Sequence, residues 1–316
     1  MSVLSQKHFH NEQAAYAFVE KRLWPEGPVC PHCGGCERIG KMGGKSTRIG
    51  TYKCYQCRKP FTVKIGTIFE ASHVKMHLWL QAIFLMASSK KGISANQLHR
   101  TLGVTLKTAW FMAHRIREAM RDGGLAPMGG SGQVVEADET YFGKKDGPAP
   151  THTTSGRPFT KGGKTGPSHK RAILGLVERG GSVRTFHVKQ ATKINVADLV
   201  TQNVHRESIL YTDESRLYSG MNEHFADHQS VKHRSGEYAR GGVHSNTIES
   251  YFSIFKRGMR GTYQHCAEKH LHRYLAEFDF RHNRRVALGK DDLTRADAIL
   301  SGVSGKRLTY ETTLER

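Results

Sequence analysis

Three acidic side chains occupy positions where simple solvation is not expected. Asp138 lies late in the apolar segment "VVEADETYFG", and Asp213 ends the apolar segment "ILYTDES". Glu249 lies near the start of an amphipathic segment, "HSNTIESYFSIFKRGMRGTY". Carboxylates gathered at one point repel each other until a cation binds, so such a cluster is costly and seldom accidental. Two Mg²⁺ ions about 3.5–4 Å apart, held by carboxylates, promote phosphodiester cleavage and strand transfer.

The elements that carry these acids follow from the periodicity of the second half of the chain. The pattern predicts a strand at residues 133–143, a hairpin at 171–189 and a further strand at 208–215. A helical pattern follows at 246–285. This order is typical of an RNase H-like domain, an α/β fold with a mixed sheet. In that fold the two acid-bearing strands are neighbours, so Asp138 and Asp213 are predicted to converge and the helix to bring Glu249.

Each acid also has a simpler interpretation. Asp213 can be a turn former or a helix cap, and Glu249 can be a solvated acid on a helix. Glu139 and Glu214 are weaker candidates, because they should point to the opposite strand face if the strands persist. The joint pattern favours the catalytic interpretation.

Four cysteines form two pairs with the spacing of a zinc ribbon. Cys30 and Cys33 form one C-x2-C pair, and Cys54 and Cys57 form the other. Two such pairs supply four thiolates to a tetrahedral Zn²⁺ ion. One structural zinc is predicted, because four cysteines leave no open coordination position. The neighbouring Cys36 breaks the paired symmetry and is left out.

A helix-turn-helix pattern follows in the next part of the chain. One helix begins after Ser94, and residues 105–120 form a second helix after a short turn. The second helix of such a pair can enter a major groove, and Lys107 and Arg115 on it are the predicted DNA contacts. The alternative is a pair of core helices in an all-α linker.

The composition indicates a polyanionic partner. Lys and Arg number 48 against 28 Asp and Glu, which gives a formal net charge of +20. Such a surface concentrates phosphates and speeds encounter, so nucleic acid is the expected partner. No apolar run approaches the ~18 residues of a membrane span, and the start of the chain lacks a signal-peptide core. We expect no membrane partner and a cytoplasmic, nucleoid-associated location.

Shifts in composition divide the chain into four predicted parts. A Gly-rich stretch, 122–133, separates helical from strand-like sequence, and the polar residues 144–170 are predicted to be a mobile loop. The predicted domains are an N-terminal helix with the zinc ribbon (1–67), a helical, helix-turn-helix-like DNA-binding region (68–126), an RNase H-like catalytic domain (127–288) and a charged C-terminal tail (289–316).

These segments, together with "HLHRYLAEFDFRHNRR", resemble a bacterial insertion-sequence DDE transposase of the zinc-ribbon type, in the family numbered fifteen ninety-five. The resemblance runs from about residue 10 to about residue 290. It implies that Asp138 and Asp213 are the two catalytic aspartates and that Glu249, at a suitable spacing, is the closing acid. Lys256, two helical turns after Glu249, occupies the place where such enzymes put a basic residue near the DNA.

Members of this family are described with either Asn or Glu as the third metal ligand. Asn246 and Glu249 lie three residues apart and can share a helix face, so both can approach the metals. Glu249 is favoured, because a charged ligand binds Mg²⁺ more tightly and the spacing to Lys256 fits it. Asn246 is then a neighbour of the metals or a direct ligand.

Basic residues continue along the same part of the chain, interleaved with aromatic residues. The aromatic side chains are predicted to be core, and the basic ones to contact phosphates. The predicted DNA contacts here are Arg257, Arg260, Lys269 and Arg273.

The predicted function is that of an enzyme, a DNA transposase. It binds the terminal inverted repeats of its element and cleaves and rejoins double-stranded DNA, both element ends and target, with two Mg²⁺ or Mn²⁺ ions. Paired ends imply a homodimer or higher oligomer on DNA. The alternatives are a non-catalytic zinc-ribbon DNA-binding regulator and an RNase H-like nuclease without strand transfer. The presence of all the acids speaks against the regulator, whereas only the resemblance separates the nuclease from the transposase.

Overall fold

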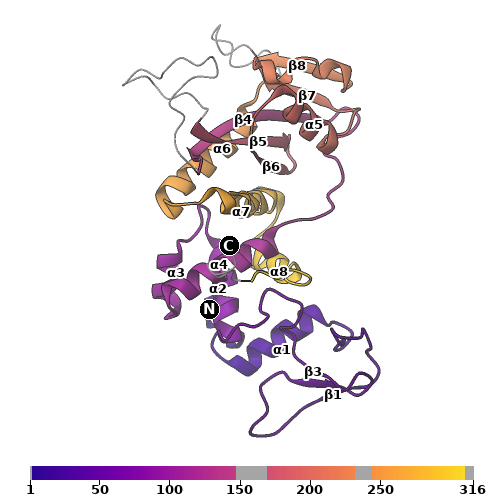
Figure 1. Ribbon diagram of the computed structural model, residues 1–316, viewed down its shortest axis with the longest axis vertical. Coiled ribbons are helices and arrows are strands. Elements are labelled where there is room, and N and C mark those ends of the chain that lie inside the picture. Colours follow the sequence, from indigo (N-terminus) through magenta and orange to yellow (C-terminus); the bar gives the residue numbers. More distant parts are fainter. Residues whose placement is uncertain (1, 147–168, 232–242, 310–316) are drawn as a thin grey trace. The chain divides into compact units, whose positions relative to one another are not determined.

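The chain divides into two compact units (Figure 1). The computed structural model describes residues 2–146, 169–231 and 243–309, so most of the predicted loop at 144–170 lies outside the described residues. The first unit contains Met1–Asp122 and Arg284–Arg316, and the second contains Gly123–Asn283. The first unit is therefore discontinuous in sequence.

A helix and a small antiparallel sheet form the N-terminal part of the first unit. These elements are α1 (Glu12–Leu23), β1 (Ile39–Lys41), β2 (Tyr52–Cys54) and β3 (Pro60–Phe61), with the strands in the order β1-β2-β3. The rings of Trp24, Tyr52 and Phe61 pack against one another, with centroids 5.6–5.8 Å apart. This aromatic cluster stabilises a sheet that is too short to form a core of its own.

Three helices follow, α2 (Met76–Ser88), α3 (Ala95–Leu102) and α4 (Leu106–Met120). Ser94 caps α3 by accepting a hydrogen bond from the backbone N–H of Gln97. Gly103 ends α3 in the left-handed region, at φ 65°, and Thr105 caps α4. The predicted pair of helices is thus present. Among the helices of the described residues, none has the length and apolar character needed to cross a membrane.

The C-terminal segment, predicted as a charged tail in which "LTRADAIL" can form a short helix, contains helix α8 (Asp292–Ser301), which packs in the first unit against α2. Ile299 and Leu300 are buried there. Arg295 donates a hydrogen bond from Nε to the carbonyl of Ala87 at 2.9 Å. The charged residues of α8 conceal a short apolar face, which explains why composition alone suggested a tail.

A mixed sheet forms the centre of the second unit. Within the described residues it has five strands in the order β6-β5-β4-β7-β8. β5 pairs antiparallel with β4 and β6, whereas β7 pairs parallel with β4 and β8. The strands are β4 (Val134–Lys144), β5 (Lys170–Glu178), β6 (Val183–Val188), β7 (Ile209–Asp213) and β8 (Asp227–Val231).

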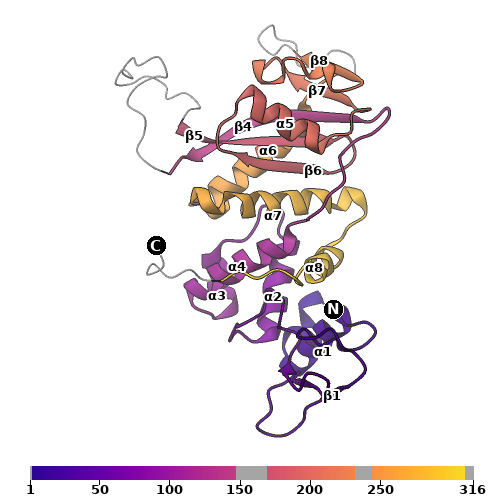
Figure 2. The ribbon, with the colours of Figure 1, turned by 45° about the vertical axis from the view of Figure 1, so that its right-hand side comes forward.

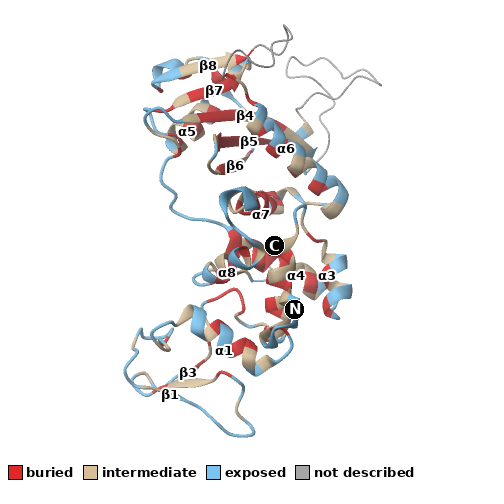
Figure 3. Ribbon diagram, turned by 180° about the vertical axis from the view of Figure 1, so that it is seen from behind, coloured by how far each residue is buried: buried red, intermediate tan, exposed pale blue. Residues whose placement is uncertain are grey.

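Helices cover both faces of this sheet (Figures 1 and 2). α5 (Lys193–Asn203) packs on one face, and α6 (Asn246–Gly258) and α7 (Leu271–Asn283) pack on the other. A π-helical turn, Met259–Tyr263, continues α6. Buried residues run along β4, β5 and β7 (Figure 3). This is the predicted RNase H-like arrangement, and it places the middle of β4 beside the C-terminal end of β7.

Two elements of the second unit were not predicted, α5 and β8. Strand β8 has the sequence "DHQSV", and only Val231 of it is buried. A polar edge strand of this kind carries little hydrophobic alternation, so the periodicity of the sequence does not reveal it.

Gly175 of β5 lies opposite Asp138 of β4 and faces helix α6. A Cβ atom at this position would lie 2.7 Å from Ile248 Cδ1 and 2.7 Å from Phe252 Cζ. These contacts are closer than packed atoms allow, so the glycine permits α6 to approach the sheet next to Asp138.

We predict that Gly175→Ala lowers the free energy of unfolding by about 1–3 kcal/mol, because the added methyl group forces α6 away from the sheet. Differential scanning calorimetry of the full chain measures the effect. Gly261→Ala is the control, since a Cβ at Gly261 meets nothing within 4 Å. Equal transition temperatures for the two variants would contradict this account of the packing.

Candidate functional site

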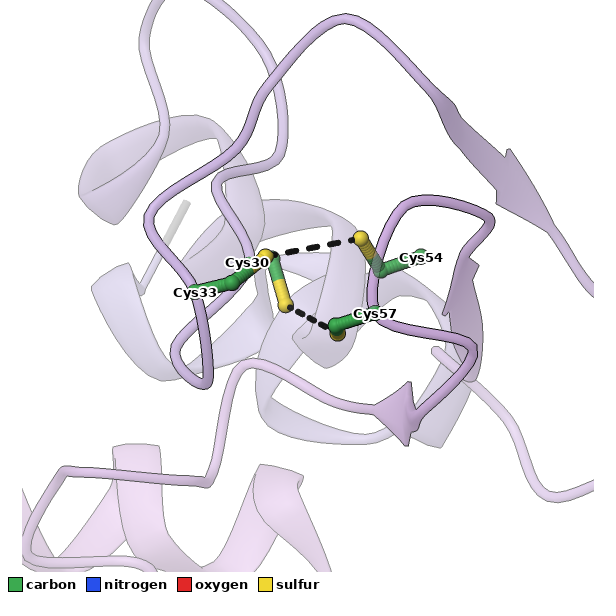
Figure 4. Close-up of side chains that lie close together, drawn as sticks. All are labelled: Cys30, Cys33, Cys54 and Cys57. Carbon is green, nitrogen blue, oxygen red and sulfur yellow. Dashed lines mark hydrogen bonds between the residues drawn. The ribbon is translucent and has the colours of Figure 1, made fainter.

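The four predicted zinc ligands lie together in the first unit (Figure 4). One Sγ atom from each of Cys30, Cys33, Cys54 and Cys57 lies within 4.8 Å of the others. The Sγ atoms of Cys30 and Cys57 are 3.6 Å apart, and those of Cys33 and Cys54 are 3.7 Å apart. These separations suit a tetrahedral site with Zn–S bonds of about 2.3 Å.

The backbone shapes each pair of cysteines into a tight turn. The N–H of Gly34 donates to the carbonyl of Cys30 at 2.8 Å, and Gly34 has a φ of 76° that favours glycine. Cys54 lies at the end of β2. Cys36 is exposed and does not belong to the group found among the described residues. The donor set therefore fits a structural zinc ion that closes the ribbon.

The acids of the second unit meet where β7 ends beside the middle of β4. These strands are parallel, and Glu136 lies opposite Tyr211. Asp138 and Asp213 each follow this pair by two residues, so their side chains reach the same level of the sheet. Carboxylate oxygens of Asp138, Glu139 and Asp213 all lie within 4.8 Å of one another. The predicted convergence of the two aspartates is present in the structure.

Glu139 joins this group although it was a weaker candidate. Alternation along β4 does direct its side chain to the α5 face, together with Val135 and Ala137. Its longer side chain still brings the carboxylate back to the edge, where Ser215 Oγ donates to Glu139 Oε1 at 3.2 Å. Strand alternation alone could not reveal this, because it gives the direction of a side chain and not its reach.

Burial and mutual repulsion change the protonation of the acids. Burial raises the pKa of Asp138 to about 8, with further contributions from the charges of Glu139, Asp213 and, least, Glu249. Burial and the charge of Asp213 also raise the pKa of Glu139. A bound divalent cation would relieve the repulsion and displace protons, so its affinity should rise with pH. An all-oxygen donor set of this kind fits Mg²⁺ or Mn²⁺.

Glu249 lies on the first turn of α6 and is exposed. Its Oε1 accepts a hydrogen bond from Ser245 Oγ at 2.8 Å. Among the described residues, the group of oxygens within 4.8 Å does not include Glu249, although its charge contributes to the raised pKa of Asp138. The structure thus places Glu249 near the aspartates but outside their closest group.

Two other predicted site residues lie on the same helix. Asn246 is the first residue of α6 and is exposed. Lys256 is half-buried: burial lowers its pKa, and the charge of Asp138 opposes that shift. The ammonium group of Lys256 is therefore within electrostatic reach of Asp138.

The predicted DNA contacts differ in their accessibility. Lys107, Arg257, Arg260 and Lys269 are exposed, whereas Arg273 is half-buried, with Nη1 at 2.7 Å from His270 Nδ1. The prediction for Arg115 does not hold, since its side chain is buried. Arg115 donates hydrogen bonds to the carbonyls of Ile68, Glu70 and Leu308 at 2.7–3.1 Å. It supports the first unit and does not present its charge to a ligand.

Two family models match the chain. The ISXO2-like transposase domain matches residues 129–283, which include the acids, and the transposase zinc-ribbon domain matches residues 10–60. Residues 129–283 therefore form an ISXO2-like transposase domain, and residues 10–60 form a transposase zinc ribbon. The resemblance inferred from the sequence is thereby confirmed.

A protein of Halobacterium salinarum named "Uncharacterized protein in transposable element ISH50" is similar to this chain. The two are 29% identical over 296 residues, which cover 91% of this chain and 96% of that protein.

Two solved structures are also similar to this chain. The Mos1 strand transfer complex has 12% identity and a TM-score of 0.28, with 70% of this chain and 72% of that chain covered. The Mos1 transposase paired-end complex with the left transposon end has 11% identity and a TM-score of 0.28, with 71% and 73% covered. At these TM-scores the backbones superpose too little to support an argument, so the assignment depends on the family matches.

We predict that Cys54→Ser removes the zinc ion, because a hydroxyl group is a poor replacement for a thiolate at a four-cysteine site. Elemental analysis of purified protein should find about one zinc per wild-type chain and much less in the variant. Cys36→Ser is the matched control and should keep its zinc. Zinc retained in Cys54→Ser, or lost from Cys36→Ser, would contradict the assigned ligands.

Proposed function

We propose that this chain is a DNA transposase that binds the terminal inverted repeats of an insertion sequence and catalyses metal-dependent strand cleavage and strand transfer. The observation that carries the proposal is the meeting of Asp138 and Asp213 from two parallel neighbouring strands. The match to the ISXO2-like transposase domain supports the same class of activity.

Each acid has a distinct part in the proposed site. Asp138 and Asp213 would hold the divalent cations, and Glu249 would complete the ligand set from α6. Glu139 accepts a hydrogen bond from Ser215 and supports the cluster from the other face of the strand. When bound, the two cations activate the attacking water or 3′-hydroxyl and stabilise the leaving oxygen. Lys256 offers a positive charge to a DNA phosphate beside Asp138.

The two units share the binding of DNA in this proposal. The zinc ribbon and the helix pair α3–α4 bind the element ends, with Lys107 at the start of α4 as a phosphate contact. Arg257, Arg260 and Lys269 are exposed on the catalytic unit and contact phosphates near the acids. Two element ends must be processed together, so at least a dimer is expected on DNA.

We predict that Asp138→Asn and Asp213→Asn each reduce Mg²⁺-dependent cleavage and joining by roughly 10³-fold or more, because each removes a charged metal ligand. Binding of end DNA should persist, since neither aspartate belongs to the zinc ribbon or the helix pair. The assay combines labelled end DNA, a supercoiled target and Mg²⁺, with end binding measured separately by gel shift.

The same assay separates the alternatives. A regulator binds the ends without metal-dependent cleavage, and a nuclease cleaves without joining the ends to the target. Full joining activity in either aspartate variant would overturn the proposed site.

We predict that Glu249→Gln abolishes cleavage as completely as Asp138→Asn, because the third ligand requires a charge. Asn246→Ala should lose roughly tenfold, and Glu139→Gln about 10- to 100-fold, as neighbours of metal ligands do. Single-turnover cleavage rates over a range of Mn²⁺ concentrations measure the three effects. If Glu249→Gln remains active while Glu139→Gln is inactive, the third ligand is Glu139 of β4 and not Glu249 of α6.

A further inference from the structure

Helix α6 begins without the usual cap from its own N-terminal flanking residue. Ser245 occupies the N-cap position, but its side chain makes no capping hydrogen bond. Its hydroxyl group instead donates to Glu249 Oε1 at 2.8 Å, as described above. The first N–H groups of a helix need an acceptor when they are buried, so another part of the chain must supply one.

Glu136 of strand β4 supplies that acceptor. Its side chain is 0% exposed, and Oε2 accepts hydrogen bonds from the backbone N–H groups of Thr247 at 2.9 Å and Ile248 at 3.1 Å. Glu136 Oε1 also accepts from Thr247 Oγ1 at 2.9 Å. A carboxylate at a helix N-terminus interacts favourably with the helix dipole as well as with the N–H groups.

Arg179, just after β5, supplies the counter-charge that this buried carboxylate requires. Its Nε lies 2.8 Å from Glu136 Oε1, and its Nη2 donates to the carbonyl of His244 at 2.9 Å. The guanidinium group also lies over the ring of Tyr211, 4.8 Å from the centroid. Glu136 and Arg179 thus connect β4 and β7 to the chain that enters α6.

We propose that Glu136 is a positioning residue that sets the place of Glu249 relative to Asp138. Along β4, Glu136 lies two residues before Asp138 on the same face of the strand. On α6, it holds Thr247, two residues before Glu249, while Ser245 remains available to orient the Glu249 carboxylate. The two acid-bearing elements are therefore joined through one buried carboxylate. This inference rests on the proposed function, in which Glu249 completes the metal site.

If Glu136 has a purely structural role, its loss should destabilise the unit without altering the metal site. Another buried glutamate of the same unit serves as the matched control. Glu277 of α7 is also 0% exposed and forms an ion pair with Arg281 in the same unit. It accepts a hydrogen bond from Tyr263 OH at 2.5 Å and does not belong to the acid group found among the described residues. Loss of either carboxylate should destabilise the unit, but only loss of Glu136 should alter the metal site.

The test uses the full, zinc-loaded chain and Mn²⁺ as the probe. Glu136→Gln keeps the size of the side chain but turns an amide N–H₂ group toward donors. We expect its Mn²⁺ affinity, measured by calorimetry without DNA, to fall about 10- to 100-fold, and the Mn²⁺ concentration for half-maximal cleavage to rise similarly. Glu277→Gln should lower the melting temperature while keeping Mn²⁺ affinity within about twofold of wild type.

Thr247→Val provides a milder variant that leaves the Glu136–Arg179 ion pair in place. It removes one hydrogen bond to the carboxylate and should weaken Mn²⁺ binding by roughly threefold to tenfold. If Glu136→Gln does not fold, this variant decides the question. Wild-type Mn²⁺ affinity in Thr247→Val, or in a folded Glu136→Gln, would show that Glu136 only stabilises the fold. Wild-type chain that binds Mn²⁺ but never cleaves would instead refute the proposed function.

Discussion

The burial and mutual repulsion of the carboxylates where β7 ends beside β4 are the constraint on which the second unit depends. Burial and neighbouring charges raise the pKa of Asp138 to about 8, so the ionised cluster opposes its own assembly. Only a backbone held in place by other interactions can keep such groups together. Five strands and helices on both faces provide that support among the described residues, and Gly175 lets α6 approach beside Asp138.

The first unit has little hydrophobic core around its small sheet, so other interactions must stabilise it. The ribbon has four cysteines placed to hold one zinc ion, and a few aromatic contacts. The helical part depends on buried polar anchors as well as apolar faces. Arg115, which was predicted to contact DNA, binds three backbone carbonyls, and Arg295 binds the carbonyl of Ala87, so both arginines are part of the scaffold.

The sequence predicted the features that are local or periodic. Cysteine spacing located the ribbon, and apolar strands ending in acids located Asp138 and Asp213. What it could not predict depends on contacts between distant parts of the chain. Glu136 resembles any acid in a strand until α6 is placed against it, and Arg115 resembles a surface base until the carbonyl of Leu308 is near. Strand β8 was missed because an edge strand needs few apolar residues.

The division of the first unit between the two ends of the chain has a consequence for biosynthesis. Ile299 and Leu300 pack in a unit whose other α-helices and strands lie before residue 123. On the ribosome, the sheet that carries the acids can fold while the partner of α2 is still being translated. Arg22 also meets its ion-pair partner Asp297 only then. The first unit therefore completes its folding last, after the whole of the second unit has emerged.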